Sequence, residues 1–236
     1  MDSPEQPKEI QRMSLSLRIQ HIVLLTSMII LSLTGLALKF HDNWFAHFVM
    51  QIEGGFEARG IIHRIFAVIL ILVGIYHSFY VLFSDEGHRD LMKLVPKLKD
   101  LKDFFRYWRR NITGSREKIP FGKYSFINKI QYWGVVLGYF IMVTTGALLW
   151  FKSISMAILP KWVIDLTIVF HGWEGLIIFI VLFLWHLYNV HLNPDYFPMN
   201  NVWLTGKISV KELKEKYPLE YAELFGSDAE VKKNED

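Results

Sequence analysis

Residues 63–77 read HRIFAVILILVGIYH, a run that has a histidine at each end and only Arg64 as another charged residue. Such a run is typical of a membrane-spanning helix, in which an ionisable side chain is costly to bury and therefore indicates a functional site. Fourteen residues of α-helix place the two imidazoles about 21 Å apart along the axis and about 40° apart around it. One face of the predicted helix thus carries a histidine near each membrane surface.

Other apolar runs of similar length occur elsewhere in the chain. We predict four membrane-spanning helices near residues 17–40, 61–83, 130–151 and 164–190, because each run meets the roughly 20 residues that cross a bilayer. Hydrophobic residues make up 52% of the 236 residues and charged residues only 21%, which leaves little room for a soluble domain. The predicted fold class is an all-α integral membrane four-helix bundle, with residues 1–236 forming a single domain.

The first apolar run follows a polar, partly acidic stretch, and no Ala-x-Ala cleavage site comes after it. We therefore interpret it as a retained span rather than a cleaved signal peptide.

The Lys and Arg residues lie mostly on one side of the four spans. Residues 84–127 carry eleven of them, whereas residues 41–60 carry only Arg59. Because positive residues favour the cytoplasmic side, we expect an inner-membrane protein with both termini, loop 84–127 and tail 192–236 in the cytoplasm. The net charge of +3 follows from this asymmetry and does not indicate nucleic-acid binding.

Residues 97–110 of the loop read KLKDLKDFFRYWRR. This pattern favours a basic, aromatic helix lying on the inner leaflet of the membrane. A plain solvated linker is the alternative interpretation.

The chain repeats itself at an offset close to 110 residues. Thr34-Gly35 in the first span corresponds to Thr145-Gly146 in the third, and His63 and His77 correspond to His171 and His186 in the fourth. The sequence therefore indicates a duplicated two-helix hairpin.

Histidines at two depths in the bundle indicate bound haem. Spans two and four run in the same direction, so we expect His63 to face His171 near the outer surface, while His77 and His21 compete as partners of His186 near the inner surface. The chain has no cysteine, which excludes covalent haem attachment and iron–sulfur ligands, so two b-type haems are expected. His171 and His186 are 15 residues apart, about 60° from eclipsed, and a local π-bulge is one way to correct that offset.

Several motifs resemble the dihaem cytochrome b subunits of respiratory formate dehydrogenases and nickel–iron hydrogenases. These motifs are Arg18-x-x-His21 leading to Thr34-Gly35, Gly60 and His63, Gly122-Lys123-Tyr124 with Asn128-Lys129 and Trp133, and Thr145-Gly146 with Trp150. The tail, with Gly206-Lys207-Ile208-Ser209, Tyr217-Pro218 and Tyr221, is similar to that of the formate dehydrogenase gamma subunit.

The resemblance implies that His63 and His171 hold the outer haem and that His21 and His186 hold the inner one. It favours His21 over His77, which that gamma subunit lacks, whereas the internal repeat favours His77. It also implies a fourth-span histidine spacing of 14 rather than 15.

The same resemblance implies a quinone site on the cytoplasmic side, near the inner haem and the start of the third span. Ser125 and Asn128 fall on positions that offer polar groups to the quinone, a menaquinone or ubiquinone. Capping of the third helix is the alternative role for both residues.

Several other residues each allow two interpretations of their role. Arg18, Arg64 and Lys129 would pair with haem propionates or extend to lipid headgroups. Gly35, Gly74 and Gly175 would leave room for porphyrin or for close helix packing, and Gly134 and Gly138 favour packing. Glu174 would relay protons or make a structural hydrogen bond. We expect His41, His47, His88 and His191 to be exposed or interfacial rather than ligands.

Together these features predict an electron-transfer subunit that anchors a respiratory oxidoreductase in the membrane. Electrons would pass between a partner redox subunit, such as an iron–sulfur protein or a multihaem cytochrome, and the quinone pool, so complete enzyme activity from this chain alone is not expected. The alternatives are a self-contained quinone-linked oxidoreductase of the cytochrome b561 type and a haem-free membrane anchor.

Overall fold

The computed structural model describes residues 8–115, 119–194, 197 and 199–226. They form two compact units, each built from separate stretches of the chain. The span unit comprises residues 19–80 and the described part of 133–200, and the polar unit comprises the described parts of 1–18, 81–132 and 201–236. The prediction that residues 1–236 form one domain stays a prediction.

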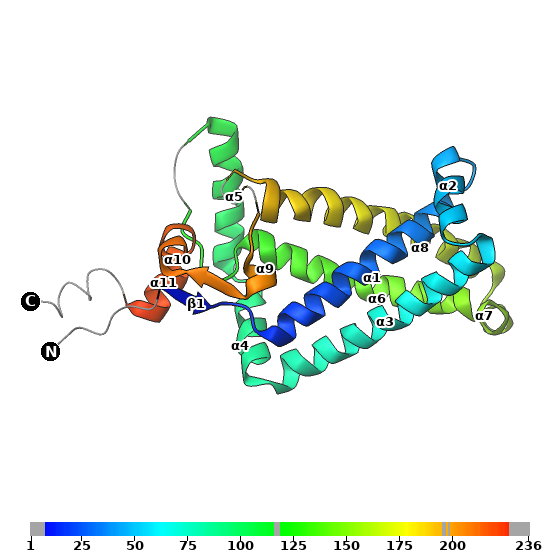
Figure 1. Ribbon diagram of the computed structural model, residues 1–236, viewed down its shortest axis with the longest axis horizontal. Coiled ribbons are helices and arrows are strands. Elements are labelled where there is room, and N and C mark those ends of the chain that lie inside the picture. The colour runs from blue at the N-terminus through cyan, green and yellow to red at the C-terminus, as the bar shows by residue number, and fades with distance from the viewer. Residues whose placement is uncertain (1–7, 116–118, 195–196, 198, 227–236) are drawn as a thin grey trace, which may run out of the picture. The chain divides into compact units, whose positions relative to one another are not determined.

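Four long apolar helices supply the span unit. They are α1 (Leu15–Lys39), α3 (Phe56–Phe83), α6 (Phe126–Trp150) and a fourth span made of α8 (Lys161–Ile180) and its continuation to Leu192. Each is long and apolar enough to cross a membrane, so the predicted all-α membrane bundle is confirmed. Figure 1 shows that α2 (Trp44–Ile52), which joins α1 to α3, and α7 (Lys152–Ile158), which joins α6 to α8, lie at the same end of these helices.

The fourth span changes its helical form near its end. After α8, residues Val181–His186 (η1) and Tyr188–Leu192 (η2) are π-helix, in which each hydrogen bond encloses one more residue than in an α-helix. The wide turn lies between His171 and His186, where the 15-residue spacing suggested it.

The polar unit is built around an antiparallel pair of short strands from opposite ends of the chain. Strand β1 (Glu9–Gln11) pairs with β2 (Lys207–Ser209), with Ile10 opposite Ile208. Helices α9 (Val202–Thr205), α10 (Val210–Lys216) and α11 (Pro218–Phe225) flank β2 in the sequence. Ile208, Leu213, Tyr217 and Tyr221 form its buried core.

Buried ion pairs connect the N-terminal strand, the 84–127 loop and the C-terminal tail. The Arg12 guanidinium contacts the Glu220 carboxylate at 3.0 Å and donates to the Lys123 carbonyl at 2.8 Å. Lys123 in turn pairs with Asp90 at 2.6 Å. These contacts hold the three segments together within the polar unit.

The loop itself folds into α4 (Asp85–Leu94) and α5 (Leu98–Thr113). The Tyr124 hydroxyl lies 3.2 Å from the Asp90 carboxylate, to which it donates. Burial and the nearby Asp90 charge raise the pKa of the Tyr124 phenol, so it remains a protonated donor.

Candidate functional site

The structure brings His63 of α3 and His171 of α8 together. Their ring centres are 6.4 Å apart and the ring planes differ by 70°. Both side chains are half-buried within the span unit. The sequence predicted this approach of His63 to His171, from the internal repeat and the common direction of spans two and four.

A threonine holds each of these two imidazoles. The Thr34 Oγ1 lies 2.8 Å from His63 Nδ1, and the Thr145 Oγ1 lies 2.9 Å from His171 Nδ1. Each hydroxyl also donates to a helix carbonyl, that of Ile30 or Ile141, at 2.7 Å. Since its proton is used there, the hydroxyl oxygen accepts from Nδ1–H, which leaves the Nε2 lone pair of each histidine available to a metal.

The glycine after each threonine lies next to the same ring. A Cβ atom on Gly35 would lie 3.5 Å from His63 Cε1, and one on Gly146 would lie 3.2 Å from His171 Cε1. The threonine of each hairpin therefore orients its histidine. The glycine at 146 also leaves space that a Cβ would crowd, whereas a Cβ at Gly35 would make ordinary van der Waals contact. The repeat revealed the Thr-Gly dipeptide in the sequence, but not that it contacts the histidine.

The other two glycines considered for porphyrin clearance face protein side chains. A Cβ on Gly74 would overlap the ring of Tyr139, whose hydroxyl donates to the Ile71 carbonyl, and one on Gly175 would contact Met142. Their surroundings are those of close helix packing.

A second pair of imidazoles lies nearer the other end of the spans. The ring centres of His21 on α1 and His186 on η1 are 6.3 Å apart, and the ring planes differ by 46°. From His21 to Thr34, which contacts His63, is 13 residues of α1, or about 20 Å along its axis. The two pairs thus lie at different depths in the span unit.

His77 has a different neighbour. Its Nδ1 lies 2.8 Å from the Oε1 of Gln20, a buried residue of α1 next to His21. The imidazole that lies beside His186 is thus that of His21, and the hydrogen-bond partner of His77 Nδ1 is Gln20. Gln20 was not singled out from the sequence, although a glutamine within an apolar span is a signal of the same kind as a histidine.

Arg59 is a further residue that the sequence interpretation assigned to a loop. It lies in the first turn of α3, is only 7% exposed, and donates from Nη1 to the Thr34 carbonyl at 2.9 Å. Its Nε is buried and has no hydrogen-bond partner among the described residues. Since His63 follows one turn later, a buried positive charge with a free donor accompanies the His63–His171 pair.

The residues expected near a quinone or a propionate lie in several different settings. Ser125 and Asn128 cap α6, because the Ser125 N–H and Oγ both donate to Asn128 Oδ1, at 2.9 and 2.8 Å. Lys129 is buried and pairs with Asp100 at 2.8 Å. The Arg64 guanidinium lies 5.7 Å from the Trp150 ring centre. The Nε of Arg18 is buried with no hydrogen bond to the described residues.

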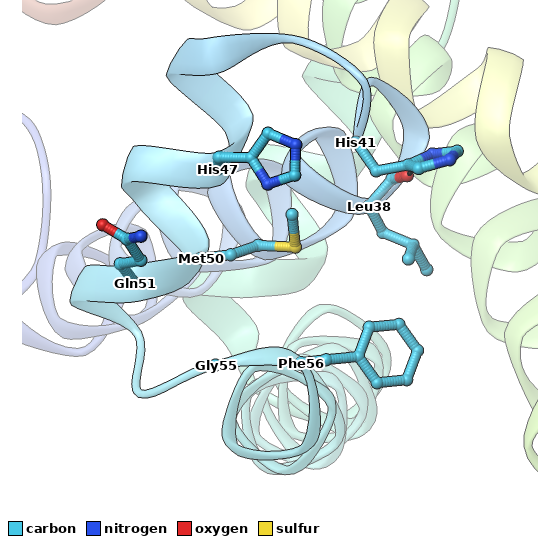
Figure 2. Close-up of a pocket in the computed structure, with 7 residues that line it drawn as sticks. All are labelled: Leu38, His41, His47, Met50, Gln51, Gly55 and Phe56. Carbon is cyan, nitrogen blue, oxygen red and sulfur yellow. Dashed lines mark hydrogen bonds between the residues drawn. The ribbon is translucent and has the colours of Figure 1, made fainter.

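The remaining ionisable candidates lie outside the two pairs. The Glu174 carboxylate is close to Gly138, where a Cβ would meet its Oε1 at 3.5 Å. His41 and His47 are exposed and line an open pocket of about 460 Å³, together with Leu38, Met50, Gln51, Gly55 and Phe56 (Figure 2). His88 is exposed and His191 is half-buried.

The geometry of the two pairs suits a metal held between opposed imidazoles. Metal–imidazole bonds of about 2 Å put the centres of two rings on opposite sides of one ion roughly 6 Å apart. In the part of the chain that the structure describes, no three His, Cys, Asp or Glu side chains gather as ligands of a bare ion. Each pair would supply two imidazole nitrogens to a metal whose other ligands come from a bound group, as in a b-type haem.

Comparisons with known proteins agree with this chemistry. The profile of the family described as prokaryotic cytochrome b561 matches residues 12–194. The cytochrome b556(Fdn) subunits of nitrate-inducible formate dehydrogenase from Escherichia coli K12, E. coli O157:H7 and Shigella flexneri are each 22% identical to this chain over 148 residues. That similarity covers 60% of this chain and 63% of each relative, which is less than two thirds of their length.

The resemblance seen in the sequence motifs is thereby confirmed at the level of the family. The matched region contains all four predicted spans and all five histidines of the candidate site. The protein is thus a multi-pass membrane cytochrome b, a class that binds b-type haem, and it belongs to the prokaryotic cytochrome b561 family.

Proposed function

We propose that this protein is the dihaem membrane subunit of a respiratory oxidoreductase, carrying electrons between a partner redox subunit and quinone. His63 and His171 would hold one haem, and His21 and His186 the other. The observation that carries the proposal is the pair of ring separations, 6.4 and 6.3 Å, each close to the spacing that one iron between two imidazoles requires. Similarity to the formate dehydrogenase subunits supports the role within a larger complex.

The surroundings of the histidines also fit haem. Thr34 and Thr145 fix the tautomer that exposes Nε2, and Gly146 keeps the space beside the His171 ring open. The unused Nε of Arg59 is a donor suited to a haem carboxylate. A haem with two imidazole ligands exchanges single electrons and has no open position for substrate.

His77 is assigned a supporting role rather than ligation. The contact between His77 Nδ1 and Gln20 orients the imidazole ring. Neither His77 nor Gln20 belongs to the His63–His171 pair or the His21–His186 pair.

The quinone is assigned to the region where α6 begins, with menaquinone and ubiquinone both compatible. The cap uses Asn128 Oδ1 and Ser125 Oγ, so the amide Nδ2 of Asn128 is the group outside the cap that could donate to a quinone oxygen. Lys129 contributes its charge to Asp100 instead.

We place both termini on the cytoplasmic side of a bacterial inner membrane. Most of the Lys and Arg residues lie in the termini and in the loop between the second and third spans, and positive residues favour the cytoplasmic side. The partner redox subunit, an iron–sulfur protein or a multihaem cytochrome, would then dock on the opposite side, where α2 and α7 join the spans. Electrons entering there and leaving at the quinone would carry charge across the membrane.

Haem content tests the ligand assignment directly. Purified wild-type protein should bind two haems per chain, measured as the pyridine haemochrome. His63→Ala and His21→Ala should each bind one, because an iron that loses an axial imidazole loses its main attachment. His77→Ala is the matched control, a histidine of the same span that should keep both haems. Two haems in His63→Ala, or one in His77→Ala, would contradict the assignment.

The alternative is a self-contained oxidoreductase of the cytochrome b561 type, which oxidises or reduces quinone without a partner. Quinol oxidation by the purified chain alone, at the rate of the intact complex, would establish that alternative.

A further inference from the structure

Helix α5 carries an exposed apolar stripe that plays no part in the proposed electron transfer. Five side chains spaced three or four residues apart share one face of the helix at 100° per residue. They are Leu98, Leu101, Phe105, Trp108 and Ile112, and each is between 54% and 83% exposed. A continuous apolar stripe of this size in water indicates a surface that another phase or molecule covers.

A different face of α5 attaches the helix to the beginning of a membrane span. The rings of Phe104 and Tyr107 contact that of Phe126, the first residue of α6, with centres 6.0 and 5.6 Å apart. Asp100 pairs with Lys129, also in the first turn of α6. Since α6 is long and apolar enough to cross the bilayer, we take its first turn as the membrane–water boundary, and the contacts with Phe126 and Lys129 hold α5 beside that turn.

Basic side chains adjoin the stripe. Lys102 and Arg109 lie next to it around the helix, and both are exposed. Positive charges beside an apolar face complement the phosphates of anionic lipids. These phosphates lie close to the level at which the lipid headgroups meet the acyl chains.

We propose that α5 docks on an anionic lipid surface, on the side of the membrane where α6 begins. The apolar stripe enters the boundary between headgroups and acyl chains, and Lys102 and Arg109 bind lipid phosphates. This surface is separate from the histidine pairs, so the proposal does not depend on the haem assignment.

The absence of cysteine from the chain allows a clean test with single spin labels. Full-length Phe105→Cys and Leu101→Cys carry the label on the stripe, and Lys99→Cys carries it on another exposed face as the matched control. Each protein is placed in nanodiscs of phosphatidylcholine alone or mixed with phosphatidylglycerol. The accessibility of the label to oxygen and to a water-soluble nickel chelate then reports its depth.

In nanodiscs with phosphatidylglycerol, labels at 101 and 105 should be accessible to oxygen and shielded from nickel, while the label at 99 stays accessible to nickel. Adding Lys102→Gln and Arg109→Gln should remove most of this shielding. Nickel accessibility at 105 equal to that at 99 would overturn the proposal. Shielding of the label from both oxygen and nickel would also overturn the proposal, because it indicates coverage by a protein partner or a second copy. The same holds if the label is shielded from nickel equally with and without phosphatidylglycerol, and equally with and without Lys102 and Arg109.

Discussion

Thr34 and Thr145 show how much a single hydroxyl decides within an apolar span. Each donates to a carbonyl of its own helix and accepts from a histidine of the next span, so the imidazole proton never lacks a partner. An unpaired N–H in hydrocarbon would cost about 1–3 kcal/mol. The hydroxyl therefore fixes both the rotation of the ring and the nitrogen that it presents.

Thr34→Val removes that hydroxyl with little change in shape. We expect weaker binding of the haem at His63–His171, by about 10–100-fold, as is usual when a hydrogen bond behind a metal ligand is lost. The reduction potential of that haem should also rise, because a ligand without an acceptor at Nδ1 donates less charge to the iron. Haem-transfer titration and redox titration measure the two effects.

Thr167→Val is the matched control for this change. Thr167 is buried in α8 and its hydroxyl donates to the Val163 carbonyl, with no histidine involved. An equal shift of potential in both variants would mean that Thr34 acts through general packing alone.

At the scale of single residues, the sequence predicted which types of residue form the candidate site but not all of the contacts that they make. His21, His63, His171 and His186 stand out because imidazole is rare in apolar runs. The roles of Gln20 and Arg59 depend on how two helices are rotated about each other, and hydropathy does not report that rotation.

At the scale of the element, the π-helix Val181–His186 resolves an irregular spacing. The 15 residues from His171 to His186 would leave the rings about 60° apart on an α-helix. A wide turn absorbs one surplus residue, and His186 then lies beside His21 with ring centres 6.3 Å apart. Such turns are often found at functional sites, since they re-aim the residues that follow.

Deleting Leu182 should therefore be tolerated. The fourth span would regain a spacing of 14 residues and continue as regular α-helix, with His186 still facing His21. We expect two haems per chain and an unchanged inner haem spectrum. Pyridine haemochrome content and absorption spectra provide the measurement.

Deleting Ile168 is the comparison, because it shortens α8 before His171 and leaves the π-helix in place. This deletion should rotate His171 by about 100° around the helix axis relative to the residues before it. The packing of α8 would then be disturbed while the π-helix keeps its extra residue. Loss of the inner haem in the Leu182 deletion would show that the π-helix is needed for more than spacing.

The ends of the spans were less predictable than their number. The second span begins at Phe56, five residues before the predicted start at 61, because Glu57 and Arg59 are helical although they are polar. Arg59 is buried, so its charge is an unreliable sign of a loop. The four apolar runs themselves were recognisable because each continues for the thickness of a bilayer.

On the scale of the whole molecule, the polar unit holds together segments that the sequence suggested were only a loop and a tail. Arg12 and Glu220 have side chains that are 9% and 6% exposed, so their pairing replaces the water that both charges lost. Nothing in the hydropathy pattern indicates that residues 208 apart would meet, since this contact depends on the complete fold.

Glu220→Gln should destabilise the polar unit by about 3–5 kcal/mol, because the Arg12 guanidinium is left buried without its carboxylate. Faster hydrogen–deuterium exchange in β2 and α10 measures the loss. Lys93→Met breaks an exposed pair with Glu223 and serves as the control, with an expected cost below about 1 kcal/mol. Equal exchange in both variants would mean that Arg12 finds sufficient hydrogen bonding elsewhere.

The pairing of β1 with β2 also sets an order of events during biogenesis. Residues 9–11 leave the ribosome first, yet their partner strand at 207–209 is synthesised only after the fourth span. The sheet can therefore close only on a chain whose spans have all been made, whereas the Thr34–His63 contact needs only the first hairpin. Nascent chains arrested before residue 207 would therefore leave the β1 edge unpaired and open to proteases, so protection of residues 9–11 reports that the whole chain has been made.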